Sequence, residues 1–362
     1  MKNFVEKTAI LMCIILLSYC YTSCNNGKTT NNKVVRFDEK IAKNEVEIKT
    51  LKTSEPIVFI TGFDKGKETF YNDARNYFKD LDYKIIEDQY SLEEIINWLN
   101  NNETELSYGE IHIVNKSDSF KGMTLETLVR GDKVTSETLR RVITKGELPI
   151  LNESVDSSTK IILHANGLGE NSELMSTFKD AFFAEELPTV IASPYYSIFN
   201  GEFSKHYLAK AYFVFYPTAN SPGKIDLSKE IARKYTNEKD IDWYDALKNY
   251  EERYVGEAYT TQLTIPVKFD LDYHNSDEAM PNFNLQEEVI EFIRQKEELY
   301  SEIKKLNIPI EKFKWSWKVK NSSLTIKGNT TCLTVLKPLI KPYGELEHVK
   351  PDTKNKRLYA MK

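Results

Sequence analysis

The chain has 362 residues, of which 41% are hydrophobic and 28% charged, and its formal net charge is −5. A chain of this length and composition buries a large core as a globular protein. The slightly acidic balance argues against nucleic-acid binding, because such domains present a strongly basic surface to the phosphate backbone. We therefore expect no nucleic-acid partner.

The first residues carry a targeting pattern. Lys2 and Lys7 precede an apolar run over residues 9–17, which is too short to span a bilayer as a helix and has the length of a signal-peptide core. The sequence YTSC follows at residues 21–24. Small residues directly before a cysteine resemble the lipobox of bacterial lipoproteins, in which that cysteine is lipidated and becomes the first residue of the mature protein.

The resemblance implies a signal peptide over residues 1–23 and a lipid on Cys24 that attaches the protein to the bacterial membrane without spanning it. Tyr21 departs from the lipobox, which usually has an aliphatic residue there, so lipidation at Cys20 and a plain secretory signal remain alternatives. Asn25 is not the acidic residue associated with inner-membrane retention in some bacteria. We therefore expect a lipid-anchored protein of the cell envelope, with the outer membrane favoured.

The number of free cysteines follows from that processing. Cys13 and Cys20 would leave with the signal peptide and Cys24 would carry lipid, which leaves Cys332 as a free thiol. No intramolecular disulfide is then expected in the mature protein. We interpret Cys332 as a small buried hydrophobic residue, because the sequence shows no base or cation that would make it a reactive thiolate.

A polar tether is expected over residues 24–53, and an alternation of strands and helices begins after it. Ser91 and Glu94 form a capping box that opens one of the helices. The predicted strands are 56–62, 83–86, 110–114, 161–164, 189–193 and 211–216. This alternation favours an α/β domain over residues 54–220, with a mostly parallel six-stranded sheet and helices on both faces.

Residues 221–362 have a different pattern, and we predict an α+β extension there. In order, the expected elements are helices at 227–235 and 243–250, a strand at 259–273 interrupted at Pro266, and one long amphipathic helix that Asn284 caps and that reaches Leu306. A terminal hairpin is predicted from strands at 323–327 and 330–336 around Gly328-Asn329.

The loop after the first strand, residues 62–68, lacks the spacing of a phosphate-binding loop. That motif needs four residues between its first glycine and its Gly-Lys pair and then a hydroxyl for magnesium. Here three residues intervene and Glu68 follows. We interpret the loop as a turn and expect no nucleotide. The G-x-S-x-G elbow of α/β-hydrolases is also missing, although a serine hydrolase built around His164 or His206 stays open.

Four potential metal ligands lie close together in the extension: Asp270, Asp272, His274 and Asp277. A calcium loop needs a central glycine and a terminal glutamate, and neither is in place. Zinc needs two or three convergent nitrogen or sulfur ligands, of which His274 is the only local one. We interpret the stretch as a solvated acidic turn and expect no metal and no cofactor.

The stretch KIILHANGLGE at residues 160–170 is where chemistry is expected, because ligands and catalytic groups collect at the carboxyl ends of strands in open α/β sheets. Together with the strand at 110–114, it resembles the caspase-like fold of clan CD cysteine peptidases, which includes caspases, gingipains and CHAT proteases. In that family a histidine closes the third strand and a cysteine closes the fourth, and CHAT members often have Gly-Leu-Gly-Glu just beyond.

The resemblance covers about residues 55–217. Residues 111–117 match the histidine strand, and residues 190–193 are similar to the fifth strand of CHAT domains. The loop that corresponds to the cysteine loop consists here of Asn166, Gly167, Leu168, Gly169 and Glu170.

Both reactive positions depart from the family, because Lys116 stands where the histidine belongs and Asn166 where the cysteine belongs. A cysteine peptidase attacks its substrate with a thiolate paired with imidazole, and asparagine cannot supply that nucleophile. The ammonium of Lys116 is no base near neutral pH unless burial lowers its pKa strongly. Alternation places His112 on the same face as Lys116. His164, at the mouth of the cleft, is interpreted as a hydrogen-bonded loop residue.

The resemblance therefore implies a catalytically inactive caspase-like domain that binds a peptide or protein in the old cleft. We expect this candidate cleft to comprise His112, Lys116, His164, Asn166, Gly167, Gly169 and Glu170. Two alternatives stay open. One is an active hydrolase or peptidase that uses His164 or His206 with an unrecognised nucleophile, and the other is a structural envelope lipoprotein whose work is done by residues 221–362.

Overall fold

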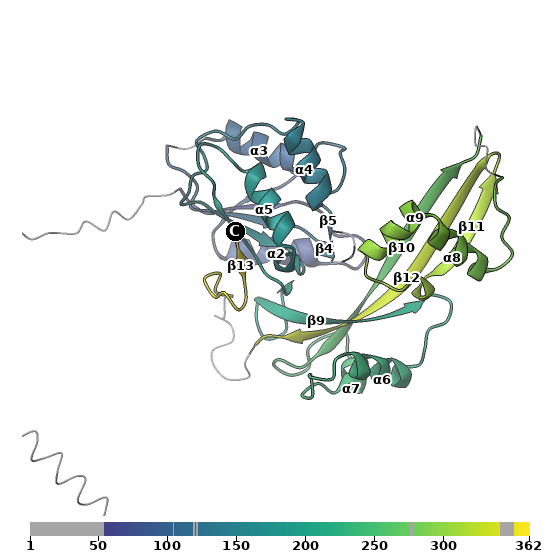
Figure 1. The fold of residues 1–362 in the computed structure, drawn as a ribbon. Helices are drawn as coiled ribbons and strands as arrows, with labels where there is room; N and C mark the ends of the chain where they lie inside the picture. The colour runs from purple at the N-terminus through teal and green to yellow at the C-terminus, as the bar shows by residue number, and fades with distance from the viewer. Residues whose placement is uncertain (1–53, 104, 119, 121, 275–278, 341–350) are drawn as a thin grey trace, which may run out of the picture. The chain divides into compact units, whose positions relative to one another are not determined.

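The structure is a computed structural model, and it describes residues 54–103, 105–118, 120, 122–274, 279–340 and 351–362 (Figure 1). The predicted signal peptide, the lipidation site Cys24 and the tether lie outside the described residues. None of the helices in the described part of the chain combines the length and the apolar composition needed to cross a bilayer.

The first sheet has six strands in the order β13-β7-β6-β3-β1-β2, and every neighbouring pair is parallel except β7 with β13. Its strands are β1 (Ile57–Ile60), β2 (Lys84–Ile86), β3 (Glu110–Val114), β6 (Lys160–His164), β7 (Thr189–Ala192) and β13 (Ala360–Met361). The prediction of a mostly parallel six-stranded α/β sheet is confirmed, as are its first five strands.

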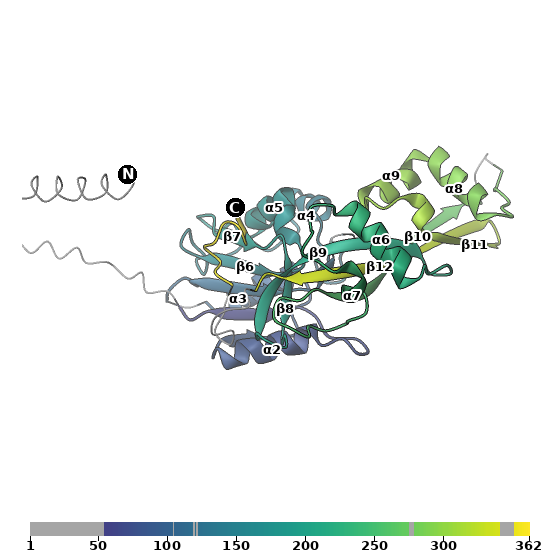
Figure 2. The same ribbon diagram turned by 90° about the horizontal axis from the view of Figure 1, so that it is seen from below.

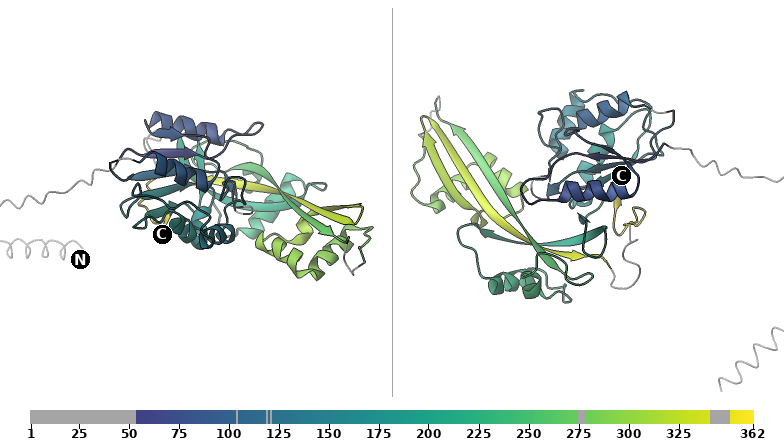
Figure 3. Two further views of the ribbon diagram at one scale, coloured as in Figure 1. Left: turned by 90° about the horizontal axis from the view of Figure 1, so that it is seen from above. Right: turned by 180° about the vertical axis from the view of Figure 1, so that it is seen from behind.

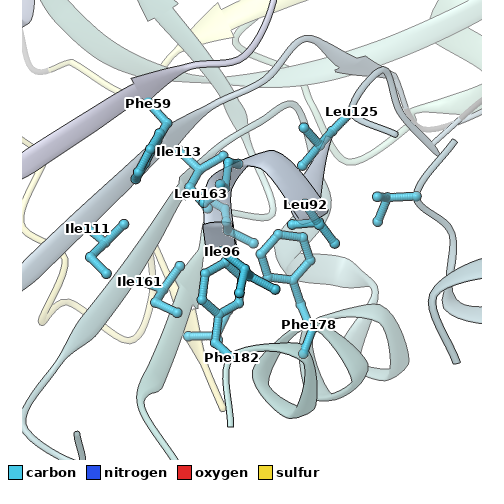
Figure 4. Packing of buried hydrophobic residues seen from close by; sticks show 14 of the residues in the cluster. Phe59, Leu92, Ile96, Ile111, Ile113, Leu125, Ile161, Leu163, Phe178 and Phe182 are labelled. Atoms are coloured by element: carbon cyan, nitrogen blue, oxygen red, sulfur yellow. The ribbon is translucent and has the colours of Figure 1, made fainter. Parts of the chain in front are cut away.

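Helices cover both faces of this sheet. The strands alternate, so that Phe59, Ile113 and Leu163 point to one face and pack against helices α3, α4 and α5 (Figure 4). On the other face, Val58 and Ile60 pack against α2. The helices are α2 (Phe70–Asp80), α3 (Leu92–Asn101), α4 (Ser136–Thr144) and α5 (Ser172–Ala181). The predicted capping box at the start of α3 is confirmed.

The prediction that residues 211–216 form the sixth strand of the first sheet is wrong. These residues belong to β9 (His206–Pro217), which pairs antiparallel with β8 (Tyr196–Phe199) and with β12 (Ser323–Pro338) in a second sheet. The apolar side chains of β9 alternate between two cores of that second sheet, Tyr212 in one and Phe215 in the other. An apolar run therefore identified the strand but not its sheet.

The second sheet has the order β10-β12-β9-β8, and β11 (Lys314–Lys320) also pairs with β12. The predicted hairpin at Gly328-Asn329 is wrong, because β12 runs through these residues without a turn and pairs with β10 (Tyr259–Asp272) along its length. Gly328 is required by the ring of Trp315, which would lie 2.6 Å from a Cβ atom there. The reversal lies between β11 and β12, where Asn321 has a left-handed φ of 55°.

Two pairs of helices cover opposite faces of the second sheet, one pair beside β9 and the other beside β11 (Figure 2). Helices α6 (Lys224–Lys234) and α7 (Trp243–Ala246) pack on Leu333 and Val335 of β12, whereas α8 (Gln286–Gln295) and α9 (Glu297–Lys305) pack on Leu324 and Ile326. Short elements complete the fold: β4 (Ser117–Asp118), β5 (Gly122–Met123), and the 3₁₀ helices η1 (Leu168–Glu170) and η2 (Ile310–Lys312).

Two further expectations for this region are corrected. The single long helix is divided into α8 and α9 by Lys296, whose φ of −97° and ψ of 99° are extended, and Leu285 rather than Asn284 is the residue that precedes α8. Pro266 does not interrupt β10, because this strand lies at an edge of the sheet, where a residue without an N–H group is tolerated.

Candidate functional site

A pocket of about 440 Å³ opens beside the carboxyl ends of β3 and β6. The two strands are adjacent and in register, with Val114 opposite His164, so the loops that follow them begin at the same edge of the sheet. The pocket is lined by Ser117, Gly122, Asn166, Gly167, Leu168, Glu170, Asn171, Ser172, Glu173 and Leu174. Three residues of the predicted cleft, Asn166, Gly167 and Glu170, therefore lie together at one pocket.

Two glycines shape the loop that forms the wall of this pocket. Gly167 has a φ of 72°, a left-handed conformation that side chains with a Cβ rarely adopt. Gly169 packs against the end of β7, and its N–H group donates a hydrogen bond of 2.9 Å to the carbonyl of Ser193. Asn171 then caps α5 by accepting the N–H group of Leu174. The loop is therefore held at both ends by backbone geometry.

Asn166 lines the pocket, and its amide oxygen is buried and has no hydrogen-bond partner among the described residues. Its own backbone carbonyl is a 3.3 Å hydrogen-bond acceptor for the Ser117 hydroxyl, which joins the two loops. A buried acceptor without a partner costs stability, so a small movement of the loop that exposes this oxygen to a ligand's hydrogen-bond donor would recover part of that cost.

Lys116 follows β3 but is not among the residues that line the pocket. Its ammonium group forms an exposed ion pair of 2.7 Å with Glu68, and its backbone N–H group donates to the hydroxyl of Tyr71. Lys116 and Asn166 thus follow adjacent strands, as the resemblance requires, but the amine is paired with a carboxylate in the loop after β1.

The segments that follow β1 and β3 are joined by a hydrogen-bond network around Asn115, which is fully buried. Its amide nitrogen donates to Thr61 Oγ1 (2.8 Å), and its amide oxygen accepts the N–H groups of Thr124 (3.0 Å) and Leu125 (3.4 Å). Thr61 in turn donates to the carbonyl of Val114. Since the side chain of Asn115 is satisfied by the protein itself, we assign it a structural role.

Three histidines meet on the sheet face that α2 covers. Nδ1 of His112 lies 2.9 Å from Nε2 of His164, and the rings of His164 and His206 meet edge to face with centroids 5.5 Å apart. All three are buried, with exposed fractions of 7%, 6% and 3%. The rings of Phe78 and Phe199 pack against this group. We call His112, His164 and His206 the histidine cluster.

Burial keeps the cluster uncharged. It lowers the pKa of His164 well below its usual value and that of His206 to about 3, and in both cases the neighbouring histidines add to the effect. Burial also lowers the pKa of His112, although Glu110 opposes the shift. The partners His112 and Lys160 hold the pKa of Glu110 down at about 2, with Glu110 oxygens 3.7 Å from His112 Nε2 and 2.9 Å from Lys160 Nζ.

His164 is hydrogen-bonded, as predicted, but it is not a loop residue at the mouth of the cleft. It is the last residue of β6 and points away from Leu163, to the face of the sheet opposite α5. The structure thus divides the predicted cleft, with His112 and His164 in the core and Asn166 at the pocket. The sequence could have shown this position of the two histidines, because successive residues of a strand point to opposite faces. Ile113 and Leu163 point to one face of the sheet, so their neighbours His112 and His164 point to the other.

The sequence also did not reveal a serine partner for His206. Oγ of Ser197 in β8 lies 2.8 Å from Nε2 of His206 in β9, in a short antiparallel hairpin that pairs Phe199 with His206. Ser197 is only 4% exposed. A nucleophile must reach its substrate, so the burial of this pair argues against a catalytic role, although its distance would allow one.

The remaining candidate residues make contacts that support the fold. The loop after β1 is a turn, as predicted, in which Asp64 accepts the N–H groups of Tyr71 and Asn72 at the start of α2. Cys332 is buried in the core under α8 and α9, as predicted. Asp270 pairs with Lys268 on β10.

Asp272 accepts the backbone N–H group of His274, and Asp277 lies outside the described residues. Across the described ranges, no three metal-ligating side chains lie close enough together to hold an ion.

Comparison of the chain with models of protein families, with curated proteins and with solved structures finds no match.

Proposed function

We propose that the protein is a lipid-anchored lipoprotein of the bacterial outer membrane, whose caspase-like domain binds a peptide or protein segment without cleaving it. The observation that carries the proposal is the amide oxygen of Asn166, which is buried and has no hydrogen-bond partner within the described part of the chain, at a pocket where the family would place its nucleophile. The arrangement of the first sheet supports the caspase-like interpretation, since the third and fourth parallel strands in chain order are neighbours and Lys116 and Asn166 follow them.

The pocket favours a ligand that donates hydrogen bonds and carries positive charge. Asn166 offers an acceptor, and the carboxylates of Glu170 and Glu173 lie on the lining, of which Glu173 is already paired with Arg140. Glu170 is exposed. An extended segment with a basic side chain would place its backbone N–H group at Asn166 and its charge at Glu170.

The test is binding of a random peptide library to the full chain in detergent. We expect binders enriched in lysine and arginine, and Asn166→Ala should weaken them roughly tenfold, as the loss of one hydrogen bond predicts. Asn76→Ala, at an exposed asparagine of α2 that does not line the pocket, is the matched control. Cleavage of the library by the parent chain that Asn166→Ala abolishes would show a peptidase and overturn the proposal.

One observation favours a second candidate function, a hydrolase. The Ser197–His206 hydrogen bond has the distance of a nucleophile and its base. A fluorophosphonate reagent, which labels activated serines, distinguishes the two functions. Labelling of the parent chain that His206→Gln removes would support the hydrolase, and the burial of both residues leads us to expect no labelling.

The anchor makes a separate prediction. Cys24→Ala should release the protein from the membrane fraction into the soluble fraction, because a lipid-anchored protein without its acyl chains has no other predicted attachment. Fractionation followed by immunoblotting measures this, with Cys332→Ala as the matched control that leaves the anchor in place. Membrane retention of Cys24→Ala would rule out the lipid anchor.

A further inference from the structure

In one part of the second sheet, none of the helices that the structure describes covers one of the two faces. Helices α8 and α9 cover the inner side of β10, β11 and the first half of β12, where Ile265, Trp315 and Leu324 point. On the other side, α6 and α7 cover only the second half of β12, at Leu333 and Val335. Seen from behind (Figure 3, right), these strands lie in front of α8 and α9.

This uncovered face is rich in lysine. Five of the residues that point outward from the three strands are exposed lysines: Lys268 in β10, Lys327 in β12, and Lys314, Lys318 and Lys320 in β11. Lys268 pairs with Lys327 across the ladder, and Lys327 pairs with Ser316. Because neighbouring strands lie about 4.8 Å apart and alternate residues about 6.8 Å apart, the five ammonium groups gather on one face of the three strands. We call these five residues the lysine face.

Few of these charges are neutralised by the protein. Lys268 pairs with Asp270 at 2.5 Å, and the other four lysines form no ion pair with any described residue. Two aspartates, Asp270 and Asp272, share the face with the five lysines, which leaves a positive surplus. The whole chain has a net charge of −5, so the surplus is a local feature.

The lysine face is also hollowed and polar. A depression of about 360 Å³ is lined by Lys268, Ser316, Trp317, Lys318, Thr325 and Lys327. Hydroxyl and amide side chains alternate with the lysines, since Ser316 stands opposite Lys327, Thr325 opposite Lys318 and Asn329 opposite Lys314. Positive charges interleaved with hydrogen-bonding groups suit a partner that carries both negative charges and hydroxyl groups.

We propose that the lysine face binds a linear anionic polysaccharide, with carboxylate, sulfate or phosphate groups at the ammonium groups and sugar hydroxyls at Ser316, Thr325 and Asn329. A nucleic acid fits less well, because single strands are held by exposed aromatic rings on which bases stack. Trp315 is buried in the core on the other side, and Trp317, although it lines the depression, packs partly buried against the same core. A flat bilayer also fits poorly against a twisted three-stranded face.

The test measures binding of the full chain in detergent to immobilised dextran sulfate and polygalacturonate, with uncharged dextran as reference. We expect saturable binding to both polyanions that weakens as salt rises. Lys268→Gln, Lys318→Gln and Lys327→Gln combined should weaken it roughly tenfold, the effect of three exposed charge contacts. The matched control removes the same charge elsewhere, with Lys79→Gln, Lys354→Gln and Lys356→Gln, and should bind as the parent does.

Three outcomes would overturn the proposal. They are failure of the parent chain to bind either polyanion, equal weakening in the two triple variants, and binding only to phosphatidylglycerol vesicles or single-stranded DNA. Circular dichroism of both triple variants keeps the comparison valid, because all six lysines are exposed and their substitution should leave the spectrum unchanged. The pocket at Asn166 plays no part in this test, so its result is independent of peptide binding.

Discussion

Acidification from pH 7 to pH 5 is expected to lower the free energy of unfolding by about 2 kcal/mol for each of His164 and His206. Burial keeps both imidazoles neutral in the folded protein, where their pKa values lie far below 6.5. In the unfolded chain they take up protons near pH 6.5. The contribution of these histidines to the free energy of unfolding is therefore complete above pH 6.5. It decreases as the pH falls toward the pKa of the folded state, which is about 3 for His206. Together the two groups remove a large part of a typical stability of about 5–15 kcal/mol.

Urea unfolding followed by tryptophan fluorescence between pH 7.5 and pH 5 measures the effect. His206→Gln and His164→Phe should each flatten the dependence on pH, and His274→Gln, which replaces an exposed histidine, is the matched control. Glu110, with a pKa of about 2, loses its contribution only below this range. Burial raises the pKa of Glu252, so protonation of this carboxyl group increases the free energy of unfolding as the pH falls. This opposite effect is the same in all variants and does not alter the comparison. Equal slopes in the parent and both cluster variants would contradict the prediction.

The first five strands of the parallel sheet were predictable because each is a short run of apolar residues bounded by turns. In β1 all four residues are buried, so the run is continuous and has no polar face. The sixth strand was not predictable, because Ala360 and Met361 form only a two-residue strand. Its place is decided by contacts distant in sequence, such as the hydrogen bond from the Ser193 hydroxyl to the carbonyl of Leu358.

The second sheet shows where local signals mislead. Gly-Asn between two β-patterns is a strong hairpin signal, but Gly328 is required by the ring of Trp315, which comes from another strand. The same limit applies to the candidate site. The sequence predicted that the loop after β6 lies at the carboxyl edge of the sheet and holds Asn166. It could not show that the Asn166 oxygen lacks a partner among the described residues, because that depends on how the two loops pack.

Gly169→Ala is expected to destabilise the protein by roughly 3 kcal/mol, at the upper end of the cost of overpacking a core. A Cβ atom at this position would lie 2.5 Å from the carbonyl oxygen of Ala192 and 2.6 Å from backbone atoms of Ser193 and Pro194. These atoms belong to the backbone at the end of β7, so the clash cannot be relieved by the rotation of a side chain. The hydrogen bond from Gly169 to Ser193 would also lengthen.

Chemical unfolding at pH 7.5 measures this cost against Gly223→Ala. Gly223 precedes α6 and has an ordinary φ of −65°, and a Cβ atom added there would have no neighbour within 4 Å, so that change should cost no more than about 1 kcal/mol. Because Gly169 holds the loop that carries Asn166, the variant should also bind pocket ligands more weakly under conditions where it is folded. A Gly169→Ala variant as stable as the parent would show that the loop does not depend on this close approach to β7.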